Sequence, residues 1–185
     1  HTVTIKKFAS GNSNRIEPTI FFKAKMAVDA DGANSAYNPS DSGIDYLENA
    51  GCKKNRGPCY GIGKVNGRLA KQDRNSEYPG FYTSSTSLAW SHSSSAMTKS
   101  DNYVDSLKVP YVVVPGGKTF RSRYGARVGD LGVIYDPKTN YVVPVYAADS
   151  GPATKIGEAS IRLMEAIGHK VYDRNNRCNL GISPS

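Results

Sequence analysis

Residues 146–160 read Tyr146-Ala-Ala-Asp149-Ser-Gly-Pro-Ala-Thr-Lys-Ile-Gly-Glu158-Ala-Ser160, a segment that carries two carboxylates around one short glycine-rich loop. The preceding residues 141–146 are typical of a β-strand, and residues 160–168 are typical of a short helix. Asp149 is therefore expected at the end of a strand and Glu158 directly before a helix. The Gly/Pro loop between them predicts that both acids turn toward one cleft.

Two carboxylates in one cleft suit the hydrolysis of a glycosidic bond. One carboxyl group donates a proton to the leaving oxygen, and the other activates a water molecule. The alternative interpretation is structural: Asp149 closes a turn and Glu158 caps the start of the helix. The spacing of the two residues alone does not decide between these interpretations.

The size of the chain predicts one domain, spanning residues 1–185. No apolar run approaches the ~20 residues that a membrane-spanning helix needs, so we expect no membrane association. The chain begins with His1 rather than Met and shows no signal peptide, which predicts a trimmed mature protein.

Two of the three cysteines, Cys52 and Cys59, flank a short loop that contains Gly57 and Pro58. This arrangement predicts a disulfide between them and an oxidising compartment, and therefore a secreted, extracellular protein. Their spacing does not suit a zinc site. Cys178 is left over, and it remains an alternative partner for either cysteine.

The net charge of +8 normally indicates an anionic partner. Residues 27–51, however, contain no Lys or Arg and five acids: Asp29, Asp31, Asp41, Asp45 and Glu48. A locally acidic groove in a basic protein can hold a cationic substrate. The alternative is that these acids are solvated loop residues.

The remaining patterns predict a mainly β protein. Alternation and β-branched residues indicate strands, and only residues 160–167 have a convincing helical face. The expected strands lie at 2–8, 18–28, 80–90, 109–114, 129–136, 141–146 and 170–172, with a helical turn at 44–49. Many strands and little helix favour a single-domain six-stranded β-barrel with one or two short helices.

Several other functions are disfavoured. The chain lacks Gly-x-Ser-x-Gly, so a serine hydrolase is not expected. Asp29-Ala-Asp31-Gly32 is similar to the opening of a calcium loop, but the later ligands are missing, and a turn closed by an Asp side chain fits better. Residues 118–127 interleave basic and aromatic residues; a strand with extended Arg side chains is favoured over a nucleic-acid contact. We expect no metal, cofactor or nucleic acid.

Three segments carry a family resemblance: residues 28–39, residues 129–136 and the 149–160 motif. They resemble glycoside hydrolase family 75, the chitosanases known mainly from fungi, and the resemblance extends from about Ile20 to Ile167. It implies a secreted, inverting endo-chitosanase whose essential Asp and Glu correspond to Asp149 and Glu158.

The strand–loop–helix ending also resembles the double-psi barrel of family 45 cellulases and expansins. By that analogy Glu158 is the general acid. Asp149 is the expected general base, because it is the other carboxylate of the pair. In the family 45 barrel the base lies on a different strand, so Asp29 or Asp31 competes with Asp149 for that role.

The resulting expectation is a monomer that binds chitosan or chito-oligosaccharides. Acidic residues would bind the glucosamine ammonium groups, and aromatic residues would stack on the sugars. The candidates are Asp29, Asp31, Asp41 and Asp45 for the ammonium groups and Tyr37, Tyr60 and Trp90 for stacking. The alternatives are a non-catalytic expansin-like wall-binding barrel and a lytic enzyme that acts on peptidoglycan.

Overall fold

The computed structural model describes residues 4–8, 19–52, 57–173 and 175–178. Within these ranges the protein is mainly β, as expected, with two short α-helices, α1 (Lys118–Tyr124) and α2 (Ile161–Ala166). Two 3-10 turns, η1 (Ala96–Thr98) and η2 (Ser100–Asn102), lie in the connection that follows residue 90. No helix in the described ranges has the length and apolar character needed to span a membrane.

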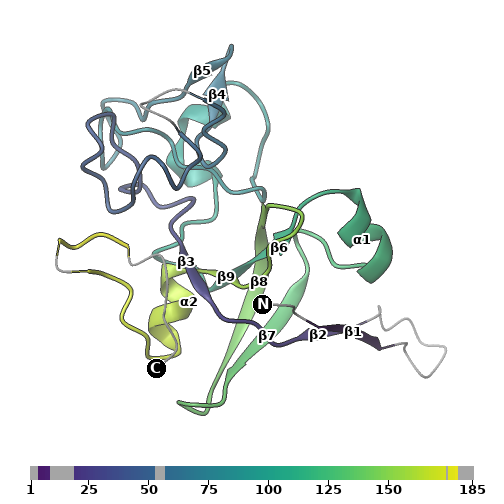
Figure 1. Ribbon diagram of the computed structural model, residues 1–185. Helices are drawn as coiled ribbons and strands as arrows, with labels where there is room; N and C mark the ends of the chain where they lie inside the picture. The colour runs from purple at the N-terminus through teal and green to yellow at the C-terminus, as the bar shows by residue number, and fades with distance from the viewer. Residues whose placement is uncertain (1–3, 9–18, 53–56, 174, 179–185) are drawn as a thin grey trace.

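The main sheet has five strands in the order β3-β9-β6-β8-β7 (Figure 1). β3 runs parallel to β9 and β6 runs parallel to β8, whereas β9 pairs with β6, and β8 with β7, in the antiparallel sense. The strands are β3 (Ala27–Asp29), β6 (Tyr111–Pro115), β7 (Leu131–Asp136), β8 (Tyr141–Gly151) and β9 (Glu158–Ser160).

Two small antiparallel sheets lie apart from the main sheet. One pairs β1 (Ile5–Phe8) with β2 (Thr19–Phe22), and the other pairs β4 (Lys64–Val65) with β5 (Arg68–Leu69). In Figure 1 the β4–β5 pair and its surrounding loops lie on one side of the main sheet, and the β7–β8 turn extends away on the other.

The expected closed six-stranded barrel is not confirmed. The main sheet ends at β3 and β7, and no closing pair between them occurs in the described residues. Two of the expected strands, 18–28 and 80–90, do not occur as continuous strands of the main sheet. The 18–28 segment divides into β2, which pairs with β1, and β3. The 80–90 segment makes only isolated bridges through Tyr82, Ser84 and Ala89, so it forms no ladder.

The expected strand over residues 118–127 is wrong, because residues 118–124 form helix α1. Gly117 (φ 91°) precedes the helix and Gly125 (φ 84°) ends it in the left-handed conformation that glycine favours. Phe120 is its buried side chain, and the basic residues between lie on the solvent side. The 44–49 segment forms turns rather than a helix, and the 170–172 segment makes one bridge, from Tyr172 to Cys178.

The C-terminal helix is correctly predicted and anchors the sheet. Ser160 caps α2 by accepting a hydrogen bond from the Leu163 N–H (3.1 Å), and its hydroxyl also accepts one from the Tyr111 N–H (3.0 Å). Ile161, Leu163 and Met164 are fully buried in the core. Glu158, two residues before the cap, is therefore held at a fixed place beside β6.

The predicted disulfide joins Cys52 to Cys59, and Cys178 is a free, buried thiol. The bridge closes the loop that follows the acidic segment, residues 27–51. It stands next to residues that line the cavity described below, among them Gly51, Tyr60 and Gly61.

Candidate active site

Asp149 and Glu158 lie on the two strands that flank β6, and the same residue stands opposite both of them. Val113 pairs with Asp149 of β8 on one side and with Glu158 of β9 on the other. Adjacent strands are ~4.8 Å apart, so the two backbone positions are separated by about 10 Å. Two carboxyl groups carried this far apart can act on opposite sides of one bond.

A register shift in β8 brings Asp149 into this position. Val112 pairs with Ala147, but the next residue, Val113, pairs with Asp149 and leaves Ala148 as an extra residue. Without this bulge, Val113 would face Ala148, and a one-residue slip would turn the Asp149 side chain to the other face of the sheet.

The third strand of the site is β3, which ends at Asp29. Asp29 pairs with Ser160, two residues beyond Glu158 on β9. The backbone N–H of Asp31 donates a hydrogen bond to Oδ1 of Asp29 (2.9 Å). This bond closes the turn that the sequence predicts here, with the Asp29 side chain as acceptor. Asp31 is packed so closely that a Cβ added at Gly61 would lie 2.3 Å from its Oδ1, so a side chain at position 61 would displace the Asp31 carboxyl group.

These elements enclose a cavity of about 660 Å³. Its size falls within the range of small-molecule sites. Among the described residues of the lining, one cation, Lys155, faces five acids. The acids in the lining are Asp29, Asp31, Asp45, Asp149 and Glu158, and the lining also includes Tyr37, Tyr60, Val113 and Asn49.

Asp149 is held by a residue far away in the sequence. The backbone N–H and the hydroxyl of Ser87 both lie 2.7 Å from Oδ1 of Asp149. The Ser87 hydroxyl is also 2.7 Å from the hydroxyl of Ser150, which follows Asp149 on β8. Asp149 thus has a fixed orientation, with Oδ1 occupied by these bonds.

Two buried tyrosines organise the aspartates of the N-terminal strand. The Tyr111 hydroxyl lies 3.1 Å from Oδ2 of Asp29 and 2.8 Å from the carbonyl oxygen of Asp31. The Tyr37 hydroxyl donates to Oδ1 of Asp31 (2.6 Å) and lies 3.3 Å from Oδ2 of Asp45. Each hydroxyl has one proton, so each tyrosine serves one acceptor at a time.

Burial shapes the protonation of these acids. Desolvation, followed by repulsion from Asp149, raises the pKa of Asp29 to about 8. Desolvation and the neighbouring Asp29 raise the pKa of Asp31 well above its ordinary value. Desolvation also raises the pKa of Asp149, although the hydrogen bonds from Ser87 oppose the shift. A cation in the cavity would therefore reduce the repulsion between these acids and favour their ionised form.

Oxygen atoms of Asp29, Asp31 and Asp149 lie within 4.8 Å of one another. Carboxylate oxygens this close can surround one small cation, whether an ammonium group or a hard metal ion. Glu158 has a different setting. It forms an ion pair with Lys155 (2.5 Å), which comes from the loop between β8 and β9.

The structure places five of the seven expected substrate-binding residues in the cavity lining: Asp29, Asp31, Tyr37, Asp45 and Tyr60. Tyr60 is 81% exposed, as a stacking residue needs to be. The Tyr37 ring is buried, so it is placed to hold Asp31 rather than to stack on a sugar. Trp90 is highly exposed but is not part of the lining.

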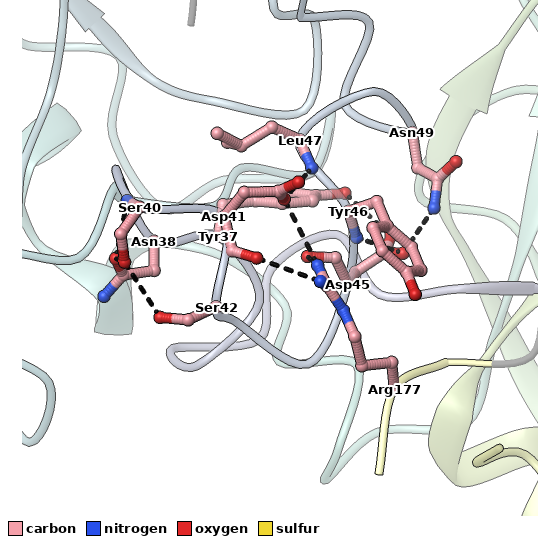
Figure 2. A network of polar contacts seen from close by, with 10 residues as sticks. All are labelled: Tyr37, Asn38, Ser40, Asp41, Ser42, Asp45, Tyr46, Leu47, Asn49 and Arg177. Atoms are coloured by element: carbon pink, nitrogen blue, oxygen red, sulfur yellow. Dashed lines mark hydrogen bonds and ion pairs between the residues drawn. The ribbon is translucent and has the colours of Figure 1, made fainter. Parts of the chain in front are cut away.

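Asp41 is also outside the cavity lining, and Figure 2 shows what it contacts instead. Its Oδ1 accepts a hydrogen bond from the Leu47 N–H (2.9 Å) and forms an ion pair with Arg177 (3.2 Å). Arg177 also lies over the Tyr46 ring, 3.4 Å from its centroid, and donates to the Asp45 carbonyl oxygen (2.8 Å). Asp41 thus joins the C-terminal segment to the acidic segment.

Sequence reasoning missed Ser87 and Tyr111. Neither residue lies in a motif, and both reach the acids through long-range contacts. No model of a known protein family matches the chain, and no curated protein matches it as a relative.

Proposed function

We propose that the protein is a secreted, inverting endo-chitosanase of the family 75 type, which hydrolyses β-1,4 bonds between glucosamine units. The observation that carries the proposal is the placement of Asp149 and Glu158 on either side of Val113. Inverting glycosidases keep their carboxyl groups about 6.5–9.5 Å apart, which leaves room for the attacking water. Side chains on strands two spacings apart are compatible with that separation.

The acidity of the cavity supports a cationic sugar as the substrate. In the part of the chain that the structure describes, five acids and one Lys line it, although the whole chain has a net charge of +8. Glucosamine carries an ammonium group that these carboxylates can bind. The disulfide supports secretion, because such bonds persist in oxidising compartments.

In the proposed mechanism Glu158 donates a proton to the leaving oxygen, and Asp149 accepts a proton from the attacking water. An ion pair requires an ionised carboxylate, so Lys155 must release Glu158 before that residue can donate. Ser87 keeps Asp149 oriented toward the water. Asp29 and Asp31 bind an ammonium group, and Asp29 is the competing candidate for the base.

One observation favours the reverse assignment of the pair. Burial raises the pKa of Asp149, which suits a proton donor, whereas Glu158 is the acid with a cationic partner. In both assignments the same two carboxylates suffice for hydrolysis, and no metal or cofactor takes part.

The experiment that tests the function is the release of reducing ends from chitosan and from peptidoglycan. We expect release from chitosan only. Release from peptidoglycan alone would favour a lytic enzyme. Binding to chitosan without any release would favour a non-catalytic, expansin-like module.

A further inference from the structure

The outward face of the β7–β8 hairpin is apolar along its whole length. Ile134, Val143 and Val145 on the inward face pack on the core. A hairpin with one face on the core normally presents polar side chains on the other. Here the exposed face consists of three cross-strand pairs, which we call the hairpin platform: Leu131 with Tyr146, Val133 with Pro144 and Tyr135 with Val142.

The side chains of the hairpin platform are open to solvent. Leu131 is 77% exposed, Val133 65% and Val142 63%. An apolar strip of this kind normally marks a binding surface. None of the six residues carries a charge, so the platform is an uncharged strip on a protein of net charge +8. A cationic polymer is therefore not repelled by the platform itself.

The dimensions of the platform argue against a second copy of the chain as its occupant. The platform consists of six residues, whereas a stable protein interface takes about 20–30 residues, or about 800 Å², from each partner. A narrow apolar strip with tyrosine rings at both ends instead fits a row of sugar rings, whose C–H faces pack on aromatic and aliphatic side chains.

The platform and the candidate active site share strand β8. Tyr146 precedes Asp149 by three residues on the same strand, β8, so about 10 Å of strand separates them. A polymer held on the platform would stay beside the cavity, and its local concentration there would rise.

We propose that the hairpin platform is a second polysaccharide-binding surface, which holds insoluble β-1,4-linked aminosugar polymer next to the cavity. The identity of the polymer rests on the proposed function, whereas the apolar mode of binding rests on the platform alone. Binding through apolar contacts should survive high salt, unlike binding to the acidic cavity. At 1 M salt the Debye length is only about 3 Å, so exposed charges no longer attract each other over a distance.

The test uses the full chain and a triple variant in which Val133, Tyr135 and Val142 are each replaced by Thr, a residue that retains β-propensity. Phe21→Thr is the matched control, because Phe21 is 59% exposed and lies in the separate β1–β2 sheet. We would measure retention on insoluble chitosan particles in about 1 M NaCl. Hydrolysis of short soluble chito-oligosaccharides is measured in parallel.

We expect the triple variant to lose retention at least about fivefold, roughly 1 kcal/mol, with oligosaccharide hydrolysis within about twofold of the parent. Unchanged retention, or no retention of the parent protein, would overturn the inference. The inference would also be overturned if the parent were a dimer, the triple variant were a monomer, and retention were the same for both. That result would make the platform a dimer interface. If the triple variant does not fold, Tyr135→Ser alone replaces it. Because retention needs no turnover, an inactive parent protein would refute the proposed function and leave this test intact.

Discussion

Asp149 and Glu158 stand opposite the same residue, Val113, from the two strands on either side of β6. This relationship depends on a bulge in β8 and on the cap of α2, which set the positions of the two acids independently. The cavity between them is closed on its third side by Asp29 at the end of β3. The following predictions test what these acids do.

The first prediction concerns the roles of the pair. Asp149→Asn and Glu158→Gln should each fold and lose at least about 100-fold in chitosan turnover, the usual scale for a general acid or base. Glu158→Gln should regain activity on an aryl glycoside, because that leaving group needs no proton. Asp149→Asn should regain activity when azide is added, because azide is a nucleophile that needs no base. Asp41→Asn is the matched control outside the cavity. The opposite pattern of rescue would reverse the roles, and an active Asp149→Asn beside an inactive Asp29→Asn would move the base to β3.

The second prediction concerns Ser87, which we propose as a positioning residue for Asp149. Its hydrogen bonds lower the pKa of Asp149 against the effect of burial. Ser87→Ala removes the hydroxyl and keeps the backbone N–H, so the pKa of Asp149 should rise. If Asp149 is the base, the acidic limb of the pH–rate profile should move to higher pH, with a loss of roughly tenfold in kcat. A profile that stays in place would show that Ser87 does not tune the base.

A third prediction concerns stability, because the pKa of Asp29 is raised from 3.8 to about 8. Below about pH 4 this carboxyl is protonated in both the folded and the unfolded chain. Between the two values the unfolded chain loses the proton and the folded protein keeps it, so the free energy of unfolding falls as pH rises, and it levels off above about pH 8.

Asp29→Asn should therefore make the decline in the free energy of unfolding between pH 5 and pH 8 shallower than in the parent. Denaturant titrations across this range measure the slope for both proteins. Equal slopes would mean that Asp29 does not carry a raised pKa in the folded state.

The fourth prediction separates Asp45 from Asp41. Asp45 lines the cavity, whereas Asp41 bonds to Arg177 and Leu47. Asp45→Asn should raise the KM for chitosan about fivefold, which corresponds to ~1 kcal/mol, and change kcat little, because in the proposed function Asp45 binds an ammonium group away from the reacting bond. Asp41→Asn should leave KM unchanged. Equal KM values for both variants, together with a kcat/KM that does not fall as salt is raised, would show that these acids are only structural.

The fifth prediction concerns the cysteines. Peptide mapping without reductant should find Cys52 joined to Cys59, and Cys178 should react with an alkylating reagent only after unfolding, because its side chain is buried. Rapid labelling of Cys178 in the native protein would contradict its place in the core.

The elements predicted correctly from the sequence are those with strong local signals. The β7–β8 hairpin has two alternating strands around a Pro-Lys-Thr-Asn turn, and α2 has a Ser cap and a left-handed glycine after it. Residues 118–124 form a helix although their aromatic residues favour a strand. The two glycines that delimit the helix, Gly117 and Gly125, are the local signal for it. The expected barrel is not confirmed, because closure of a sheet depends on pairings between distant segments that no local pattern reports.

In the candidate site, too, local relationships were predictable from the sequence and long-range contacts were not. Asp149 and Glu158 were predictable as neighbours because one short loop joins them. The approach of Asp29 depends on the parallel pairing of β3 with β9, and Ser87 reaches Asp149 across 62 residues of sequence. No local pattern reports such contacts, and a polar Ser-rich segment such as 83–87 gives no sign of which hydroxyl faces an acid.

The anomeric form of the first product tests the central claim most directly. Hydrolysis of a chito-oligosaccharide can be followed by proton NMR before the new reducing end equilibrates. Inversion at a β-1,4 bond by Asp149 and Glu158, on either side of the sugar, predicts that the α-anomer forms first. A product that begins as the β-anomer would contradict the account, and so would an intact oligosaccharide.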